Sequence, residues 1–274
     1  MNFLLPVNRT LSLLLILLAT SVSQWLNAQD TTHLPAKKIK LSVVPHAGFF
    51  FPSSEIRDHF AVRQDINAFY DNDQSGGMLG SFTYGSSTGL SVELSFPKAG
   101  IGLSTGVRYS IVRSKVSGSV NNSSDFLYLR YGDSSEETRF ARIRSMDETN
   151  SFLLIPFEVR YNLVQQQYFS LFARLGAEIG FIRLSHETSI DFHNPEMAPF
   201  EEEVLKSVEI PTDNFFSTAY ASFGAEFSKN GKTGYIFEVT IPGTLLSNNN
   251  FNLVKTGLVP GFRLAACIPL TPKK

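Results

Sequence analysis

Polar and apolar residues alternate with a period of two along most of this chain, and no other feature constrains its fold as strongly. Between Ile101 and Ile111, apolar, Thr and Tyr residues occupy the odd positions, whereas Gly, Ser and Arg occupy the even ones. This pattern is typical of a β-strand with two different faces, not of a helix. It recurs in eight candidate strands, at residues 39–51, 79–96, 101–113, 152–163, 168–184, 215–227, 235–241 and 253–268. The sequence therefore predicts an all-β fold, in which residues 201–208 could form a short helix inside a loop.

The connections between these strands alternate between short and long. The turn-like connections are residues 97–100, 165–167 and 228–234, and the last contains the hairpin dipeptide Asn230 and Gly231. The long polar connections are residues 52–78, 114–151, 185–214 and 243–251. Outer-membrane barrels have this asymmetry, because their periplasmic turns are short and their extracellular loops are longer. We therefore expect residues 39–270 to form an eight-stranded antiparallel up-and-down transmembrane β-barrel, with the long loops on one side and the short turns on the other.

The two faces of the predicted strands differ in charge. One face carries apolar residues such as Leu175, Phe223 and Val239 and almost no charge. The other face combines Gly and Ser with nine charged residues: Glu93, Arg108, Glu158, Arg160, Arg174, Glu178, Glu226, Glu238 and Arg263. Alternation alone fits a soluble barrel as well as a membrane barrel. The small residues and the near balance of five Glu against four Arg favour a membrane barrel, since unpaired buried charge is costly.

We therefore expect the apolar face to contact lipid and the charged face to line the lumen. The interior of an eight-stranded barrel is just wide enough to be filled by side chains. The nine charged residues are accordingly predicted to form a structural ion-pair network that plugs the barrel. A narrow path for ions or protons through the same residues is the alternative.

The N-terminal segment has the features of an export signal. Arg9 precedes an apolar run at residues 11–19, which is too short to span a bilayer. A small-residue motif ends at Ala28, so cleavage is expected between Ala28 and Gln29. The predicted divisions are a signal peptide (1–28), an N-terminal tail (29–38), the barrel (39–270) and a C-terminal tail (271–274). Export and the barrel pattern together predict a location in the cell outer membrane.

Composition and motifs argue against several other functions. The formal net charge of −1 argues against binding nucleic acid through bulk charge, and the single cysteine excludes an intrachain disulfide or a Cys-cluster zinc site. No P-loop, Rossmann fingerprint or HExxH motif is present. Ser185 and His186 are neighbours at a strand end, but neighbouring strand residues point to opposite faces and cannot form a Ser–His dyad. We therefore expect no enzyme activity, no cofactor and no metal.

Some residues have both a structural and a functional interpretation. His46 has the lumen-facing parity of the first strand, where we expect a hydrogen-bonded structural residue and not a ligand. Acidic residues of one long loop could bind Ca²⁺, although a solvated acidic loop is the better interpretation; they are Asp191, Glu196, Glu201, Glu202 and Glu203. Pro156 and Pro260 each remove a donor from the sheet, so we expect bulges or kinks there.

Several short segments resemble one protein family. Residues 152–161, with the sequence FLLIPFEVRY, are similar to a central-strand motif of Bacteroidetes outer-membrane β-barrel proteins, the porin-like and PorT-like group. The Gly-Ala-Glu segments at residues 176–178 and 224–226 resemble strands of the same group, and Ala28 followed by Gln29 resembles its usual cleavage site. The resemblance implies a signal-bearing barrel inserted in the outer membrane, without a cofactor.

The leading hypothesis is a non-enzymatic integral outer-membrane barrel with a plugged, ion-paired lumen, whose surface loops bind a partner or support an envelope or export system. Its expected partners are outer-membrane lipid, the outer-membrane assembly machinery and an envelope or extracellular protein, but no nucleic acid. The alternatives are a soluble periplasmic β-barrel that binds a small apolar ligand, and a lipid-modifying barrel enzyme.

One long loop contains a candidate binding element. Residues 126–143 alternate on both sides of an acidic turn and are predicted to form a β-hairpin beyond the membrane. Tyr128 and Tyr131 are its candidate binding residues, because Tyr is enriched in interface hot spots. A hairpin that only packs on the other loops is the alternative.

Overall fold

The computed structural model of the chain describes residues 39–57, 60–63, 79–118, 126–131, 139–208, 215–228, 233–245 and 251–270. The expected signal peptide, its cleavage between Ala28 and Gln29, and the two expected tails lie outside these residues and stay predictions. Among the described residues, no helix is long and apolar enough to cross a membrane.

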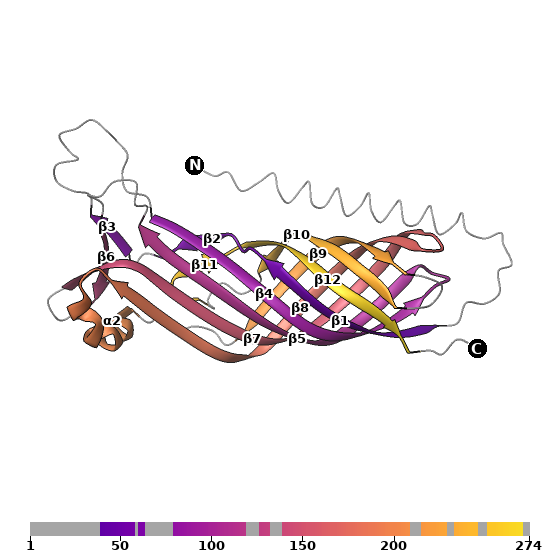
Figure 1. Cartoon of the computed structure of the whole chain (residues 1–274), viewed down its shortest axis with the longest axis horizontal. Helices are drawn as coiled ribbons and strands as arrows, with labels where there is room; N and C mark the ends of the chain where they lie inside the picture. Colours follow the sequence, from indigo (N-terminus) through magenta and orange to yellow (C-terminus); the bar gives the residue numbers. More distant parts are fainter. Residues whose placement is uncertain are drawn as a thin grey trace, which may run out of the picture. The chain divides into compact units, whose positions relative to one another are not determined.

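Eight strands form a closed antiparallel ring (Figure 1). They are β1 (Lys40–Phe50), β4 (Leu79–Phe96), β5 (Ile101–Gly118), β7 (Arg139–Gln165), β8 (Phe169–Phe192), β9 (Phe216–Phe227), β10 (Gly234–Leu245) and β12 (Leu258–Pro269). Each pairs with the ring strand before and after it in the chain, and β1 pairs with β12 to close the ring. The predicted eight-stranded up-and-down barrel is confirmed.

Short turns connect the ring at one end. Residues 97–100 join β4 to β5, and Gly100 has a φ of 67°, which L side chains rarely adopt. Residues 166–168 join β7 to β8. β1 begins and β12 ends at one end of the barrel, because Ser42 pairs with Pro269. The short connections predicted at these two places are confirmed.

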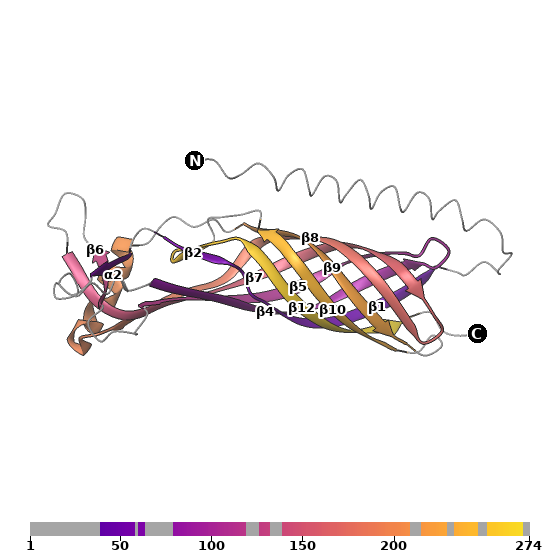
Figure 2. The same cartoon turned by 90° about the horizontal axis from the view of Figure 1, so that it is seen from above.

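At the other end, some strands continue beyond the ring. The pairing of β8 with β9 ends at Gly180 and Phe216, yet β8 runs on to Phe192. β7 likewise begins well before its pairing with β5. Figure 2 shows β7 running past the ring toward β6 and α2. We call this part of the molecule the extension; it comprises β3 (Phe60–Arg63), β6 (Phe126–Tyr131), residues 139–151 of β7 and residues 183–192 of β8.

Four smaller elements lie in the long connections. β2 (Ser54–Ile56) pairs with β11 (Val254–Thr256) as a separate two-stranded sheet. The 3₁₀ helix η2 (Pro195–Phe200) leads directly into α2 (Glu201–Val208), where the short helix was expected. The hairpin predicted at residues 126–143 is confirmed, since β6 pairs with the first residues of β7 from Leu127 with Ile143 to Tyr131 with Arg139.

Two predictions about the long connections are wrong. Much of residues 114–151 and 185–214 is strand and not loop, because β5, β7 and β8 run far into these segments. The inward side chains of these strands include polar ones such as Glu148 and Asn150, so the sequence lacks the apolar alternation by which a strand is recognised. These buried polar side chains are satisfied by hydrogen bonds. The single strand predicted at residues 253–268 is interrupted at Gly257, and its first part belongs to β11.

The apolar face of the ring is outside and the charged face is inside, as predicted. Leu175, Phe223 and Val239 are 60%, 51% and 48% exposed. A soluble barrel has the opposite arrangement, so this distribution is that of a barrel surrounded by lipid.

The expected irregularities at the two prolines are confirmed. The β5–β7 pairing skips the position of Pro156, and the β7–β8 register shifts nearby, between Leu153 and Ile155. The β10–β12 register shifts opposite Pro260, between Thr240 and Gly243.

Candidate functional site

Charged side chains from seven strands of the ring converge in the lumen. Because residues two apart on a strand share a face, each contributing strand places its charged residues on the inner side. Eight of the nine predicted residues are buried, and the Glu226 side chain is 15% exposed. The contributing residues are Glu93 on β4, Arg108 on β5, Glu158 and Arg160 on β7, Arg174 and Glu178 on β8, Glu226 on β9, Glu238 on β10 and Arg263 on β12.

Glu158 is the centre of this arrangement. Its Oε1 atom lies 3.1 Å from Nη2 of Arg108 and 2.5 Å from Nη1 of Arg263, while its Oε2 atom lies 2.5 Å from Nη1 of Arg174. The Ser104 hydroxyl donates to Oε2 at 2.9 Å, and the Tyr220 hydroxyl donates to Oε1. Three guanidinium groups and two hydroxyls therefore compensate one buried carboxylate, which removes most of the penalty for burying its charge.

The remaining ion pairs connect all nine residues into one network. Arg174 also approaches Glu238 at 3.3 Å and Glu93 at 3.8 Å. Arg263 pairs with Glu238 at 2.6 Å, and Arg108 pairs with Glu178. The last two residues, Arg160 and Glu226, join through contacts of Arg160 with Glu226 at 2.5 Å and with Glu93 at 3.5 Å. Hereafter we call these nine residues the lumen network.

Uncharged residues that the charge pattern did not identify contact the lumen network. Ser222 donates to Glu238, as Tyr220 does to Glu158. The ring of Phe172 contacts two guanidinium groups, with its centroid 4.1 Å from that of Arg160 and 5.3 Å from that of Arg174. Tyr220 and Phe172 have the same parity on their strands as the charged residues, so the alternation itself carried the signal that could have found them.

Glycines leave room for these side chains. A Cβ atom on Gly224 would lie 2.3 Å from the Phe172 ring, and one on Gly176 would lie 2.5 Å from the Tyr220 ring. The structure shows that these two accommodate aromatic rings.

His46 connects β1 to the lumen network, and its hydrogen bonds require the neutral form of the imidazole. Nε of Arg108 donates to Nε2 of His46 at 3.0 Å, so this ring nitrogen carries no proton. Nδ1 then donates to the carbonyl oxygen of Val44 at 3.1 Å. The hydrogen-bonded structural role expected for His46 is confirmed.

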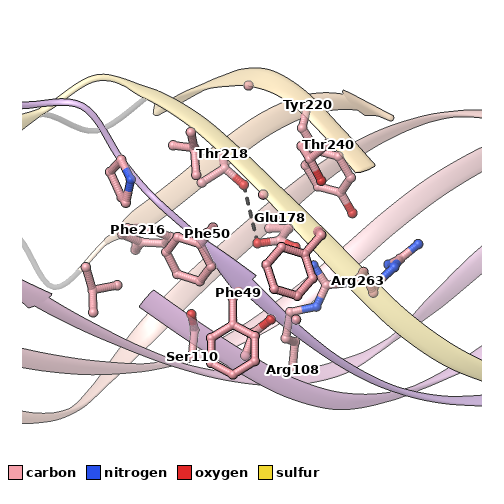
Figure 3. A pocket seen from close by; sticks show the side chains of 18 of the residues that line it. Phe49, Phe50, Arg108, Ser110, Glu178, Phe216, Thr218, Tyr220, Thr240 and Arg263 are labelled. Atoms are coloured by element: carbon pink, nitrogen blue, oxygen red, sulfur yellow. Dashed lines mark hydrogen bonds and ion pairs between the residues drawn. The ribbon is translucent and has the colours of Figure 1, made fainter. Parts of the chain in front are cut away.

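A small cavity adjoins the lumen network (Figure 3). Its volume is about 80 Å³, room for a few water molecules. Arg108, Glu178 and Arg263 line it together with aromatic residues, including Phe50 and Phe216, and Thr218 donates to Glu178 at 3.3 Å. The cavity therefore lies between the charged network and an apolar layer.

The apolar layer closes the lumen toward the extension. It includes Phe152 and Phe216, whose rings stack with centroids 4.7 Å apart, and Phe251, which is 6.4 Å from Phe152. Residues 251–254 are buried here, although they belong to the connection between β10 and β12. This connection therefore folds back into the mouth of the ring. We call residues 251–256 the plug segment.

A buried carboxylate holds the plug segment in place. Glu148 accepts the main-chain N–H groups of Asn252 at 2.9 Å and Leu253 at 3.0 Å, and it also accepts from the side-chain amide of Asn150 at 3.0 Å. Nδ1 of His186 lies 2.7 Å from Oδ1 of Asn150, and its Nε2 lies 3.1 Å from the amide nitrogen of Asn252. The sequence prediction missed this clamp, because Glu148 and His186 stood in segments expected to be loops.

The other candidate residues have separate roles. The Ser185 hydroxyl lies 2.6 Å from that of Ser151, so Ser185 and His186 have different partners. Among the described residues, no group of three His, Cys, Asp or Glu side chains is arranged to hold a metal ion. Several acidic residues of the candidate Ca²⁺ loop have other partners: Glu202 pairs with Lys206 at 3.0 Å, and Glu196 accepts from Asn194.

The structure places the main chain of the two candidate tyrosines in β6. Tyr128 pairs with Arg142 on one side and with Ala61 on the other, and Tyr131 pairs with Arg139. Their side chains lie outside the described part of the molecule. The structure therefore places both residues in the extension without testing their role.

The ring, its apolar outer face and its filled lumen define an integral membrane β-barrel. The family described as outer membrane protein beta-barrel domain matches residues 27–228, and the chain belongs to this family. The protein is therefore located in the outer membrane, surrounded by its lipid. The soluble periplasmic barrel that alternation alone left open is excluded.

Solved structures with a similar arrangement are remote in sequence. The transport unit of the autotransporter AIDA-I from Escherichia coli is 8% identical, with a TM-score of 0.28 over 91% of this chain and 96% of that one. The translocator domain of the autotransporter NalP from Neisseria meningitidis is also 8% identical, with a TM-score of 0.28 over 95% of this chain and 97% of that one. None of the curated proteins matches the chain significantly. Similarities this remote carry no inference about its function.

Proposed function

We propose that this protein is a closed, non-enzymatic outer-membrane barrel that presents the extension as a binding surface. The observation that carries the proposal is the double closure of the lumen. The lumen network fills the membrane-spanning part, and the apolar layer with the plug segment fills the mouth. A solute would have to break several buried ion pairs and then displace packed aromatic rings.

Two features favour a closed lumen and argue against a narrow path for ions. Carboxylates and guanidinium groups alternate within the lumen network, so each charge is compensated by a neighbour and not by a passing ion. Beyond the small cavity, the route meets the side chains of Phe152, Leu154 and Phe251, which are almost fully buried and offer no polar partner to a dehydrated ion.

Conductance of the purified protein in planar lipid bilayers tests closure. We expect no discrete conductance steps from the folded protein, whose insertion is verified by its heat-modifiable gel mobility. An open porin, reconstituted in the same way, provides the positive control. Reproducible steps from the folded protein would refute a closed lumen.

The proposed binding role concerns the extension, which lies on the long-loop side that faces outward in barrels of this class. We propose that an envelope or extracellular protein binds here, and that Tyr128 and Tyr131 contribute to the contact. The extension supports this proposal, because rigid elements that carry exposed edges and loops commonly hold binding sites. Insertion of the barrel would depend on the outer-membrane assembly machinery.

Paired tyrosine substitutions test this contact. Tyr128→Ser with Tyr131→Ser should abolish capture of a partner by crosslinking on intact cells while the protein keeps its folded gel mobility. Tyr168→Ser, at the short-turn end, is the matched control. Equal capture by the double variant and the control would remove these tyrosines from the binding surface.

The resemblance of residues 152–161 to Bacteroidetes porin-like and PorT-like barrels supports a finer assignment. We propose that the protein belongs to that group and supports an envelope or export system. Deletion of the gene followed by comparison of the secreted proteins tests this role. An unchanged set of secreted proteins would contradict it.

A further inference from the structure

The edge of β8 in the extension has no partner strand among the described residues. β9 pairs with β8 only as far as Gly180, and no described strand pairs with this edge further along. On its other edge, β8 pairs with β7 in continuous register from Ser185 with Ser151 to Asp191 with Ser145. Within the described part of the chain, residues 186–190 therefore form an edge of a regular sheet without a partner strand. We call them the β8 edge.

One contact shows which main-chain groups point away from β7. The N–H of Ile190 donates to Oε1 of Glu201 at 2.7 Å, so its main chain faces α2 and not β7. In an antiparallel ladder, residues two apart have the same orientation. The N–H and carbonyl groups of Thr188 and His186 therefore face the same side as those of Ile190. Among the residues that the structure describes, Glu201 accepts from one of these three outward N–H groups. A neighbouring strand would provide acceptors for all three.

A groove runs beside the β8 edge. Its volume is about 610 Å³, and its walls come from the β7–β8 sheet, η2 and α2. Thr188 lines it, together with the carboxylates of Asp147, Glu187, Glu201 and Glu202. An extended peptide is the occupant whose main chain matches the edge and whose side chains could enter this groove.

The charges of the groove indicate the charge of the peptide that would bind there. Asp147 lies 3.3 Å from Lys115 and Glu202 lies 3.0 Å from Lys206, but these pairs are largely exposed and therefore weak. Among the described residues, no Lys or Arg pairs with Glu187. The groove therefore carries excess negative charge and complements cationic side chains.

We propose that an extended segment of a partner protein, rich in Lys or Arg, adds to the β8 edge as a further strand. Its main chain pairs with Thr188 and His186, and its cationic side chains contact Glu187 and the carboxylates of α2. Exposed edges are commonly protected in native sheets, and among the described side chains Glu201 protects the position of Ile190 alone. The inference deepens the proposed binding role of the extension by naming the surface and the partner's chemistry.

The experiment measures peptide binding to the full-length protein folded in zwitterionic detergent. The probe is a capped peptide of about nine alternating lysine and valine residues, which extends to roughly 30 Å. Thr188→Pro removes one outward N–H and leaves the ladder with β7 intact, because that N–H does not face β7. Thr188→Val keeps the N–H and is the matched control. We expect Thr188→Pro to weaken binding about fivefold or more, the effect of one lost main-chain hydrogen bond, and Thr188→Val to bind as wild type does.

A second pair of variants tests the charge. Glu187→Lys changes a groove carboxylate, whereas Glu203→Lys makes the same change on α2 at a residue that does not line the groove. We expect Glu187→Lys to weaken binding several-fold and Glu203→Lys to have a much smaller effect. A glutamate–valine peptide of equal length should not bind.

A peptide methylated at every second main-chain nitrogen keeps the experiment decisive even where Thr188→Pro fails to fold. Equal binding of methylated and unmethylated peptides to the wild-type protein would overturn the proposal. Equal binding by Thr188→Pro and Thr188→Val would also overturn it. Self-association lost in Thr188→Pro would assign the edge to a second copy of the chain and equally overturn it. Partner capture that depends on Tyr128 and Tyr131 but not on Thr188 would leave the proposed function standing and refute only this site.

Discussion

Replacement of Glu158 by Gln tests whether the lumen network stabilises the barrel. The substitution keeps the size of the side chain and removes the charge that three guanidinium groups share, those of Arg108, Arg174 and Arg263. The amide oxygen can still accept from one of them, but the amide N–H₂ then faces another donor. Breaking a buried ion pair costs about 3–5 kcal/mol. We expect a loss of about 3 kcal/mol in the free energy of unfolding, at the lower end because one hydrogen bond survives.

Glu226→Gln is the matched control. Among the described residues, Glu226 pairs with Arg160 alone, and its side chain is 15% exposed, against 2% for Glu158. Its loss should cost less than that of Glu158, because it removes one ion pair and not three. The measurement is urea unfolding in lipid vesicles, followed by gel mobility, because the only tryptophan, Trp25, lies in the predicted signal peptide. A loss for Glu158→Gln no larger than that for Glu226→Gln would show that the network does not stabilise the fold.

Three further substitutions have distinct expected outcomes. Glu148→Ala should release the plug segment and make it sensitive to added protease, while the ring keeps its heat-modifiable mobility; a protected plug segment would contradict the clamp. Val239→Arg places a charge on the lipid face and should reduce folding stability in bilayers by about 2–4 kcal/mol, measured by the same unfolding assay. Gly106→Ala should impair folding yield, because its Cβ atom would lie 2.1 Å from the carbonyl oxygen of Leu90, whereas Gly80→Ala, with its nearest atom at 3.8 Å, should fold normally.

The sequence predicted the ring well because lipid enforces a strict alternation. Every membrane-spanning strand must place apolar residues outward, so the parity of one residue, such as Val239, fixes that of its neighbours. The lumen set followed from the same parity, including Glu158 and Arg263 on distant strands. The same parity places Tyr220 and Phe172 in the lumen, although a prediction based on charge alone does not include them.

The extension and the plug segment could not be predicted in the same way. Beyond the lipid, a strand has no obligatory apolar face, so polar residues such as Glu148 and Asn150 made β7 resemble a loop. The return of residues 251–254 into the mouth depends on contacts with Glu148, about a hundred positions earlier in the chain. No local pattern encodes such a contact.

The side chains of β5 indicate where the membrane ends. They also indicate why the two closures of the lumen use opposite chemistry. On β5, the outward side chains are apolar or aromatic at Val107 and Tyr109 and become charged at Arg113 and Lys115. The inward side chains change in the opposite sense, from the buried Arg108 to the buried apolar Val112 and Val116.

Where lipid surrounds the ring, the outer face provides the hydrophobic contact, and the lumen can hold a compensated ionic network. Where water surrounds the strands, apolar side chains can be buried only on the inside, and there aromatic rings and the plug segment close the mouth. The stretch from Ile101 to Ile111 matches the roughly 9–11 residues that a tilted strand needs to cross a bilayer. The change from ion pairs to apolar packing therefore coincides with the outer boundary of the membrane, and both closures follow from one set of eight strands passing from lipid into water.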